Sequence, residues 1–116
     1  MNEYADKEKI QVFEGTNGQV TMFWSRIEIT RKGLKGFLNS GLAGTKIIFL
    51  RHLTAIQFKE AGKCTNGYIQ FIFPGSSENK NGFFSATKDE NTVFFSKEQQ
   101  INFEKLRDVI ISRHDF

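Results

Sequence analysis

The sequence predicts one α+β, mainly β domain in which a bent antiparallel sheet or barrel of about seven strands is capped by one C-terminal α-helix. Short segments that alternate apolar and polar residues recur along the chain, and turn sequences rich in Gly and Asn separate them. After residue 95 the spacing of apolar residues changes from two to about 3.6, the period of a helix. The length of 116 residues is that of a single domain.

Seven or eight short strands are expected, each bounded by a turn sequence. The segments cover residues 10–14, 19–24, 26–30, 46–50, 54–59, 68–73, 83–86 and 92–95. Two of the turns contain an Asn-Gly pair, at Asn17-Gly18 and Asn66-Gly67, and this pair favours a hairpin because both residues accept positive φ. The segment 68–73 is the most apolar, so we expect it to form a central strand.

The last segment has the pattern of an amphipathic helix over residues 97–113. Ser96 is the expected N-cap, and Gln99 stands three residues later, as in a capping box. The expected apolar face consists of Phe103, Leu106 and Ile110, flanked by Ile101 and Val109. Because such a face must be buried, we expect the helix to close the open end of the curled sheet.

Residues 31–46 contain four glycines and no strand period, so we expect a long loop there, a frequent place for function. Its candidate ligand-binding residues are Arg31, Lys32, Lys35, Phe37, Leu38 and Lys46. Cations interspersed with apolar side chains suit an anionic phospholipid surface. The alternative is that the apolar residues fold back onto the core while the cations are merely solvated.

A resemblance to a known family rests on four segments, 13–20, 54–59, 65–71 and 86–93. The most specific pieces are Asn66-Gly67-Tyr68-Ile69-Gln70-Phe71 and Thr87-Lys88-Asp89-Glu90-Asn91-Thr92. On these segments the chain resembles a bacterial pleckstrin-homology-like (PH-like) family of uncharacterised domains, found mainly in Gram-positive bacteria and their phages. The resemblance implies a PH-like barrel with a capping helix over residues 10–116, after a polar lead-in at 1–9. It implies no chemistry.

Net charge and the distribution of apolar residues indicate which kinds of partner and cellular location to expect. The net charge of +3 is low for a nucleic-acid-binding protein, and no recognition module is evident, which disfavours nucleic acid. The chain has no apolar run of membrane-spanning length. Residues 1–9 are polar and lack the apolar core of a signal peptide, so we expect a cytoplasmic protein.

The residue types that carry catalysis or bind metals are sparse. His52, His114 and Cys64 do not share the short spacing of a metal site, so neither a metal nor another cofactor is expected. Asp89 and Glu90 are adjacent on an expected turn, where neighbouring side chains point apart, and this suits a turn cap better than acid–base chemistry. The sequence therefore predicts a protein that is not an enzyme.

Two pairs of adjacent aromatic residues provide the argument for an interface. They are Phe83-Phe84 and Phe94-Phe95. Neighbours in a strand point to opposite faces, so one ring of each pair must leave the sheet interior and needs a cover. The cover is either the domain's own loops or a partner, including a second copy. We therefore expect a binding or scaffolding module that acts through protein contacts, with anionic phospholipid as the alternative ligand.

Overall fold

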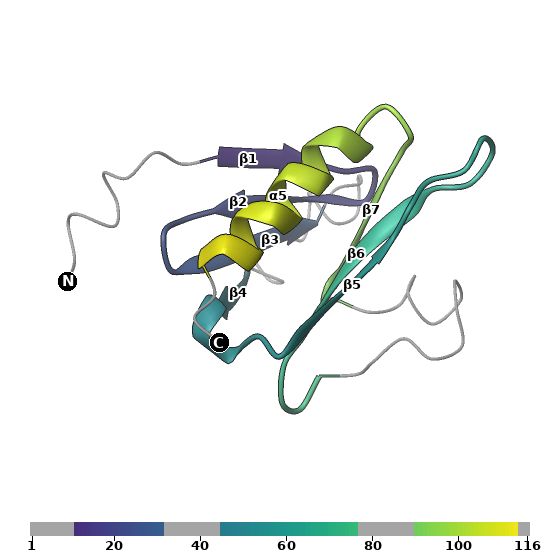
Figure 1. Cartoon of the computed structure of the whole chain (residues 1–116). Helices are drawn as coiled ribbons and strands as arrows, with labels where there is room; N and C mark the ends of the chain where they lie inside the picture. The colour runs from purple at the N-terminus through teal and green to yellow at the C-terminus, as the bar shows by residue number, and fades with distance from the viewer. Residues whose placement is uncertain (1–10, 32–44, 77–89, 114–116) are drawn as a thin grey trace.

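The structure is a computed structural model that describes residues 11–31, 45–76 and 90–113. The described residues form seven strands, one short 3-10 helix and one α-helix, shown in chain order in Figure 1. The elements are β1 (Gln11–Glu14), β2 (Gly18–Met22), β3 (Arg26–Arg31), β4 (Lys46–Phe49), η1 (Leu50–His52), β5 (Ala55–Lys59), β6 (Gly67–Ile72), β7 (Thr92–Phe95) and α5 (Gln100–Arg113). The expected lead-in at 1–9 and the expected strand at 83–86 lie outside the described residues.

The seven strands form two antiparallel sheets. One contains β1, β2, β3 and β4 in that order, and the other contains β5, β6 and β7. The predicted fold class is confirmed, since the chain is mainly β with one C-terminal helix, although the strands remain two sheets and do not close into one barrel. Each strand predicted within the described residues matches an observed strand, and their ends differ by no more than two residues.

The alternation of the strands places one face of each sheet in a shared core. The four-stranded sheet contributes Phe13, Val20, Met22, Ile27, Ile29 and Ile48, and the three-stranded sheet contributes Ile69, Phe71, Val93 and Phe95. The segment 68–73 was expected to be central, and β6 does lie between β5 and β7. Five of its six residues are buried, as expected for a strand that lies between two others.

The C-terminal helix begins with the predicted capping box. The Ser96 N–H donates to Gln99 Oε1 at 2.9 Å, and the Gln99 N–H donates to Ser96 Oγ at 3.3 Å. A turn at residues 97–99 leads into α5, which therefore begins three residues later than predicted and ends at Arg113 as predicted. Ile101 was expected beside the apolar face, but it is 58% exposed, whereas Val109 packs against the core.

Both predicted Asn-Gly hairpins form, but not for the expected reason. Within the described residues, positive φ occurs only at Gly75, so neither Asn-Gly pair uses it. Gly18 begins β2, and a Cβ there would lie 2.7 Å from the Thr30 carbonyl oxygen on β3. A Cβ at Gly67 would likewise overlap the Lys59 carbonyl oxygen on β5. Glycine is required here because the neighbouring backbone comes too close for any side chain.

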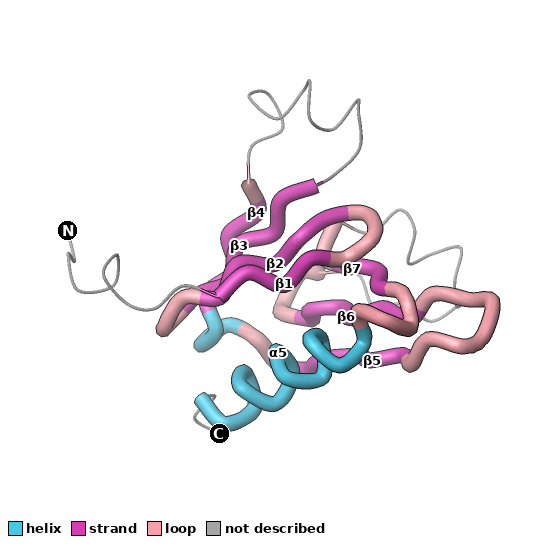
Figure 2. The backbone as a smooth tube through the Cα atoms, turned by 90° about the horizontal axis from the view of Figure 1, so that it is seen from above, coloured by secondary structure: helices cyan, strands magenta, loops and turns pink. Residues whose placement is uncertain are grey.

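One aromatic residue of the helix, Phe103, contacts both sheets. The Phe103 ring of α5 stacks on Phe95 of β7, with centroids 4.9 Å apart and planes inclined by 19°. The same ring lies 6.4 Å from Phe13 of β1. Figure 2 shows α5 lying beneath the four-stranded sheet and beside the other one, so that it covers the open side of the core. Phe103, Leu106 and Ile110 are all buried in that position.

Replacing Phe103 tests whether this contact holds the layers together. We expect Phe103→Ala to lower the free energy of unfolding by about 3–5 kcal/mol, because it leaves a cavity at the junction of three elements. Ile101→Ala on the exposed side of the same helix should change it by no more than about 0.5 kcal/mol. Urea unfolding followed by circular dichroism measures both, and equal losses in the two variants would contradict this role.

Candidate functional site

The outer edge of β7 is covered by the chain itself. The Phe94 N–H donates to Asn17 Oδ1 at 2.8 Å, and the Phe94 carbonyl accepts from the Thr16 N–H at 2.8 Å. Near the start of the same strand, Arg31 Nη1 donates to the Thr92 carbonyl at 2.7 Å. The turn between β1 and β2 and the end of β3 therefore fasten the two sheets together along this edge.

The predicted ligand loop is only partly within the described residues. Arg31 uses its guanidinium in the contact with β7, and Lys46 Nζ forms an ion pair with Glu90 Oε1 at 2.6 Å. The Lys46 ammonium also lies 5.7 Å from the centroid of the Phe73 ring. Of the remaining loop candidates, Lys32, Lys35, Phe37 and Leu38 lie outside the described residues. Lipid binding by this segment stays a prediction.

The described aromatic pair, Phe94-Phe95, is buried on both faces of its sheet. Phe95 lies in the shared core, 5.2 Å from the Phe58 ring. Phe94 points to the opposite face, where its ring meets Tyr68 edge-on at 5.7 Å and keeps 5% exposure. Because both rings are buried, this pair has little exposed surface that a partner could contact. Phe83 and Phe84 lie outside the described residues.

The candidate catalytic and metal-binding residues do not come together in the described part of the chain. His52 lies in η1 with its ring edge-on to Phe49 at 6.0 Å, and Cys64 is exposed in the turn between β5 and β6. Glu90 is occupied by Lys46, while Asp89 and His114 lie outside the described residues. Among the residues described, no three His, Cys, Asp or Glu side chains are placed to hold a metal ion.

In contrast to β7, strand β4 has one edge that no other described strand pairs with, and we call it the open edge of β4. Leu50 N donates to the Ser25 carbonyl at 2.9 Å, in register with the pairing of β3 and β4. Because hydrogen bonds alternate along an antiparallel pair, Ile48 bonds to β3, and the backbone groups of Ile47 and Phe49 point away from it. Within residues 11–31, 45–76 and 90–113, no strand pairs with that side of β4.

The side chains at the same two positions are also exposed. Ile47 is 49% exposed and Phe49 is 41% exposed, on the face of the sheet that points away from the core. Ile48 between them is buried, as alternation requires. This short strand therefore presents apolar side chains, and backbone groups without a partner among the described residues, to its surroundings. Such an edge is where a further strand can pair.

A group of aromatic and basic side chains continues from the end of β4, and we call it the aromatic–arginine end. It consists of Phe23, Trp24, Arg26, Phe49, Arg51, His52 and Arg113. Arg113 Nη1, from the last turn of α5, donates to the Phe23 carbonyl at 3.0 Å and contacts the Trp24 carbonyl at 3.4 Å. Its guanidinium lies 4.3 Å from the centroid of the Trp24 ring, and Trp24 is 58% exposed.

The charge of this end is positive among the described contacts. Arg26 lies 3.8 Å from the Phe23 centroid and is neutralised by Glu28, with Nε and Oε2 2.9 Å apart. The Arg51 guanidinium lies 5.3 Å from the centroid of the Phe49 ring. Neither Arg51 nor Arg113 has a carboxylate within salt-bridge distance in the part of the chain that is described. The cations of this end thus outnumber its acids.

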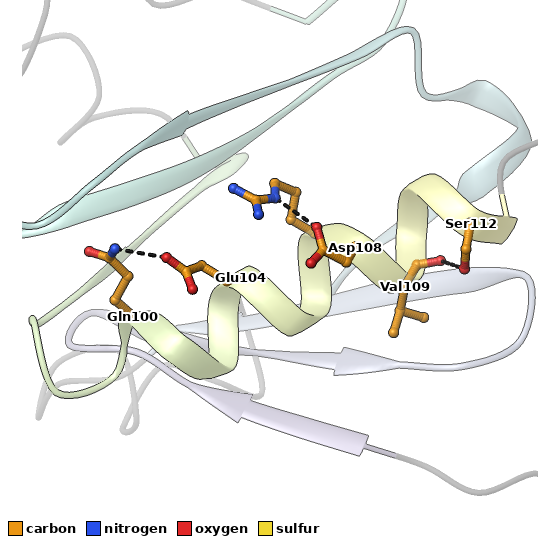
Figure 3. A network of polar contacts seen from close by, with 6 residues as sticks. Gln100, Glu104, Asp108, Val109 and Ser112 are labelled. Atoms are coloured by element: carbon orange, nitrogen blue, oxygen red, sulfur yellow. Dashed lines mark hydrogen bonds and ion pairs between the residues drawn. The ribbon is translucent and has the colours of Figure 1, made fainter.

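The polar side chains of α5 that are drawn in Figure 3 offer no comparable site, because they bond one another or the backbone. Gln100 Nε2 donates to Glu104 Oε2 at 2.9 Å, and Ser112 Oγ donates to the Val109 carbonyl at 2.8 Å (Figure 3). Arg107 pairs with Asp108 and covers the Phe58 ring of β5, 4.7 Å from its centroid. The Gln100 side chain also accepts from the Ala61 N–H at 2.7 Å. The space between β5 and the helix is therefore occupied by the protein's own side chains.

A comparison with known families places the chain. Residues 24–110 match the family model described as a domain of unknown function, DUF4429. The chain belongs to this family. The matched range runs from Trp24 to Ile110 and includes β4 and most of the aromatic–arginine end. No curated protein and no solved structure matches the chain. No helix among the described residues of this DUF4429 domain is long and apolar enough to span a bilayer.

Sequence reasoning missed the open edge for an identifiable reason. The run Lys46-Ile47-Ile48-Phe49-Leu50 was interpreted as an ordinary strand, yet it is apolar on both faces. A strand with one solvated face should alternate, so successive apolar residues at 47, 48 and 49 were a signal of either burial or an interface.

Substitution of Asn17 tests whether its hydrogen bond to the Phe94 N–H holds the two sheets together at the edge of β7. We expect Asn17→Ala to cost about 1–3 kcal/mol of stability, because it removes the acceptor of a buried N–H on β7. Asn17→Asp keeps an acceptor oxygen and should cost less. Asn66→Ala, at the other hairpin, is the matched control, since none of the described side-chain hydrogen bonds involves it. If Asn17→Ala and Asn66→Ala unfold at the same urea concentration, the proposed fastening is wrong.

Proposed function

We propose that this DUF4429 domain is a non-enzymatic binding module that recognises another protein chain through the open edge of β4. The observation that carries the proposal is the coincidence at Ile47 and Phe49 of outward-pointing backbone groups and exposed apolar side chains. Strand addition uses both features, since the backbone hydrogen bonds supply affinity and the side chains supply selectivity. The edge of β7 differs, because it is fastened by Thr16, Asn17 and Arg31.

We further infer that DUF4429 domains are relatives of PH-like domains. The order of seven strands followed by one helix supports this kinship, as do the segments that resemble that family. On the same resemblance we propose a bacterial or phage source. The cytoplasmic location expected from the sequence stays a proposal. A binding role suits such a scaffold, because PH-like folds present edges and loops around a rigid core.

Peripheral binding of anionic phospholipid through residues 31–46 remains the rival proposal. Its support is the basic and apolar composition of that segment. The described contacts weaken it, because Arg31 is bound to Thr92 and Lys46 is paired with Glu90. A cation that is already engaged has less to gain from a lipid phosphate.

Photo-cross-linking tests the protein-binding proposal and needs no named partner. We expect a benzophenone amino acid at position 47 to give a discrete protein adduct in the cells that make the domain. The same probe at position 12 is the matched control, since Val12 is 50% exposed on the outer side of β1. Ile47→Lys together with Phe49→Lys should abolish adducts of a probe at residue 24, with stability changed by no more than about 0.5 kcal/mol.

Two outcomes would overturn the proposal. The first is an equal adduct yield at positions 47 and 12, or none at either. The second is binding of the domain to phosphatidylcholine vesicles that contain phosphatidylglycerol. The lipid alternative requires that Lys32→Glu together with Lys35→Glu abolishes this binding, whereas the β4 substitutions leave it unchanged. The second result would establish the lipid alternative instead.

A further inference from the structure

We propose that the chain bound at β4 is an extended acidic segment, with apolar residues beside Ile47 and Phe49 and a carboxylate at Arg51. This inference rests on the proposed function and adds the chemistry of the partner. Its basis is the order of side chains along β4 and η1. Ile47, Phe49 and Arg51 are spaced by two residues; the first two are exposed and apolar, and the third is a cation.

The spacing of an added strand fits that order. Side chains on one face of a strand recur every two residues, about 6.6–6.8 Å apart. A strand paired with β4 therefore places consecutive same-face residues beside Ile47 and Phe49. The next residue on that face reaches the end of β4, where the chain turns into η1 and the Arg51 guanidinium lies 5.3 Å from the Phe49 ring centroid. An acidic residue there meets a cation.

The charge of the aromatic–arginine end selects for acidic partners. Arg26 is paired with Glu28, whereas Arg51 and Arg113 have no carboxylate partner among the described residues. Arginine binds carboxylates through two parallel hydrogen bonds, which are stronger than neutral ones. A basic segment would instead add like charge beside the exposed Arg51 and the partly buried Arg113. The exposed Trp24 and the arginines also have the composition of interface residues that contribute most to affinity.

A second copy of this chain fits the edge less well than an acidic segment. Antiparallel pairing of two β4 strands brings the start of one strand near the end of the other, and so Lys46 near Arg51. Two short edges of four residues also bury far less than the roughly 1,200 Å² of a stable interface. Neither objection applies to an extended partner that continues past β4 onto the aromatic–arginine end.

A membrane surface is also a poorer occupant of this edge. The outward N–H and C=O groups of Ile47 and Phe49 would have no partner in lipid, which costs several kcal/mol for each group. A peptide strand supplies those partners by its own backbone. The features of β4 therefore favour a polypeptide over a bilayer.

Selection from a phage-displayed library of random dodecapeptides tests the inference on the full chain. We expect peptides retained by the wild-type domain, but not by Ile47→Lys with Phe49→Lys, to alternate apolar residues and to carry Asp or Glu toward one end. Trp24 is the sole tryptophan and lies beside η1, so its fluorescence reports binding of a synthetic selected peptide. Arg51→Ala should weaken that binding roughly tenfold or more.

Arg107→Ala is the matched control, because Arg107 also covers an aromatic ring but lies on α5, facing β5. It should leave the affinity unchanged. Selected peptides that need Ile47 but are neutral or basic, or that bind Arg51→Ala as tightly as wild type, would overturn this inference and leave the proposed function standing. Absence of any peptide that depends on Ile47 would overturn both. A dimer abolished by the β4 substitutions, or vesicle binding that needs Arg51, would replace the acidic segment by a second copy or a membrane.

Discussion

The packing of Phe103 against rings from both sheets is the contact on which the rest of the domain depends. A four-stranded and a three-stranded sheet share one core without closing into a barrel, so their inner faces need a third element to exclude water. Phe103 meets Phe13 of one sheet and Phe95 of the other, and this fixes where α5 lies. The position of α5 in turn places Arg113 on the turn that carries Trp24. The aromatic–arginine end is thus a consequence of core packing.

The local features of the fold were predictable because they depend on near neighbours. Alternation fixed the strands, and the reciprocal bonds of Ser96 and Gln99 were predicted from a spacing of three. The role of Gly18 was not predictable, since it follows from the approach of Thr30 on the next strand. Ile101 was misplaced because periodicity alone cannot tell the edge of a helix face from its exposed side.

The candidate site was harder to predict, because it depends on contacts between residues that are far apart in the sequence. Whether β4 is an open edge depends on which strand lies beside it, and that is decided by the pairing of the whole sheet. Arg31 is a candidate ligand residue by composition, and only the structure shows that its guanidinium reaches a carbonyl 61 residues away in sequence. Trp24 and Arg113 are 89 residues apart, so no spacing rule could join them. The sequence shows the chemical type of each residue, whereas the fold determines which residues lie close together.

The fastening of β7 by the first hairpin has a consequence for how the chain is made. Asn17 and Phe94 are 77 residues apart, and Arg113 reaches back across 90 residues to Phe23. Contacts of such large sequence separation are formed late and slow the search for the native state. During synthesis on the ribosome, the core that contains Val20 and Ile27 stays incomplete until β7 and α5 emerge. The nascent N-terminal sheet therefore exposes apolar surface for as long as its C-terminal partners are missing, and such surface favours aggregation.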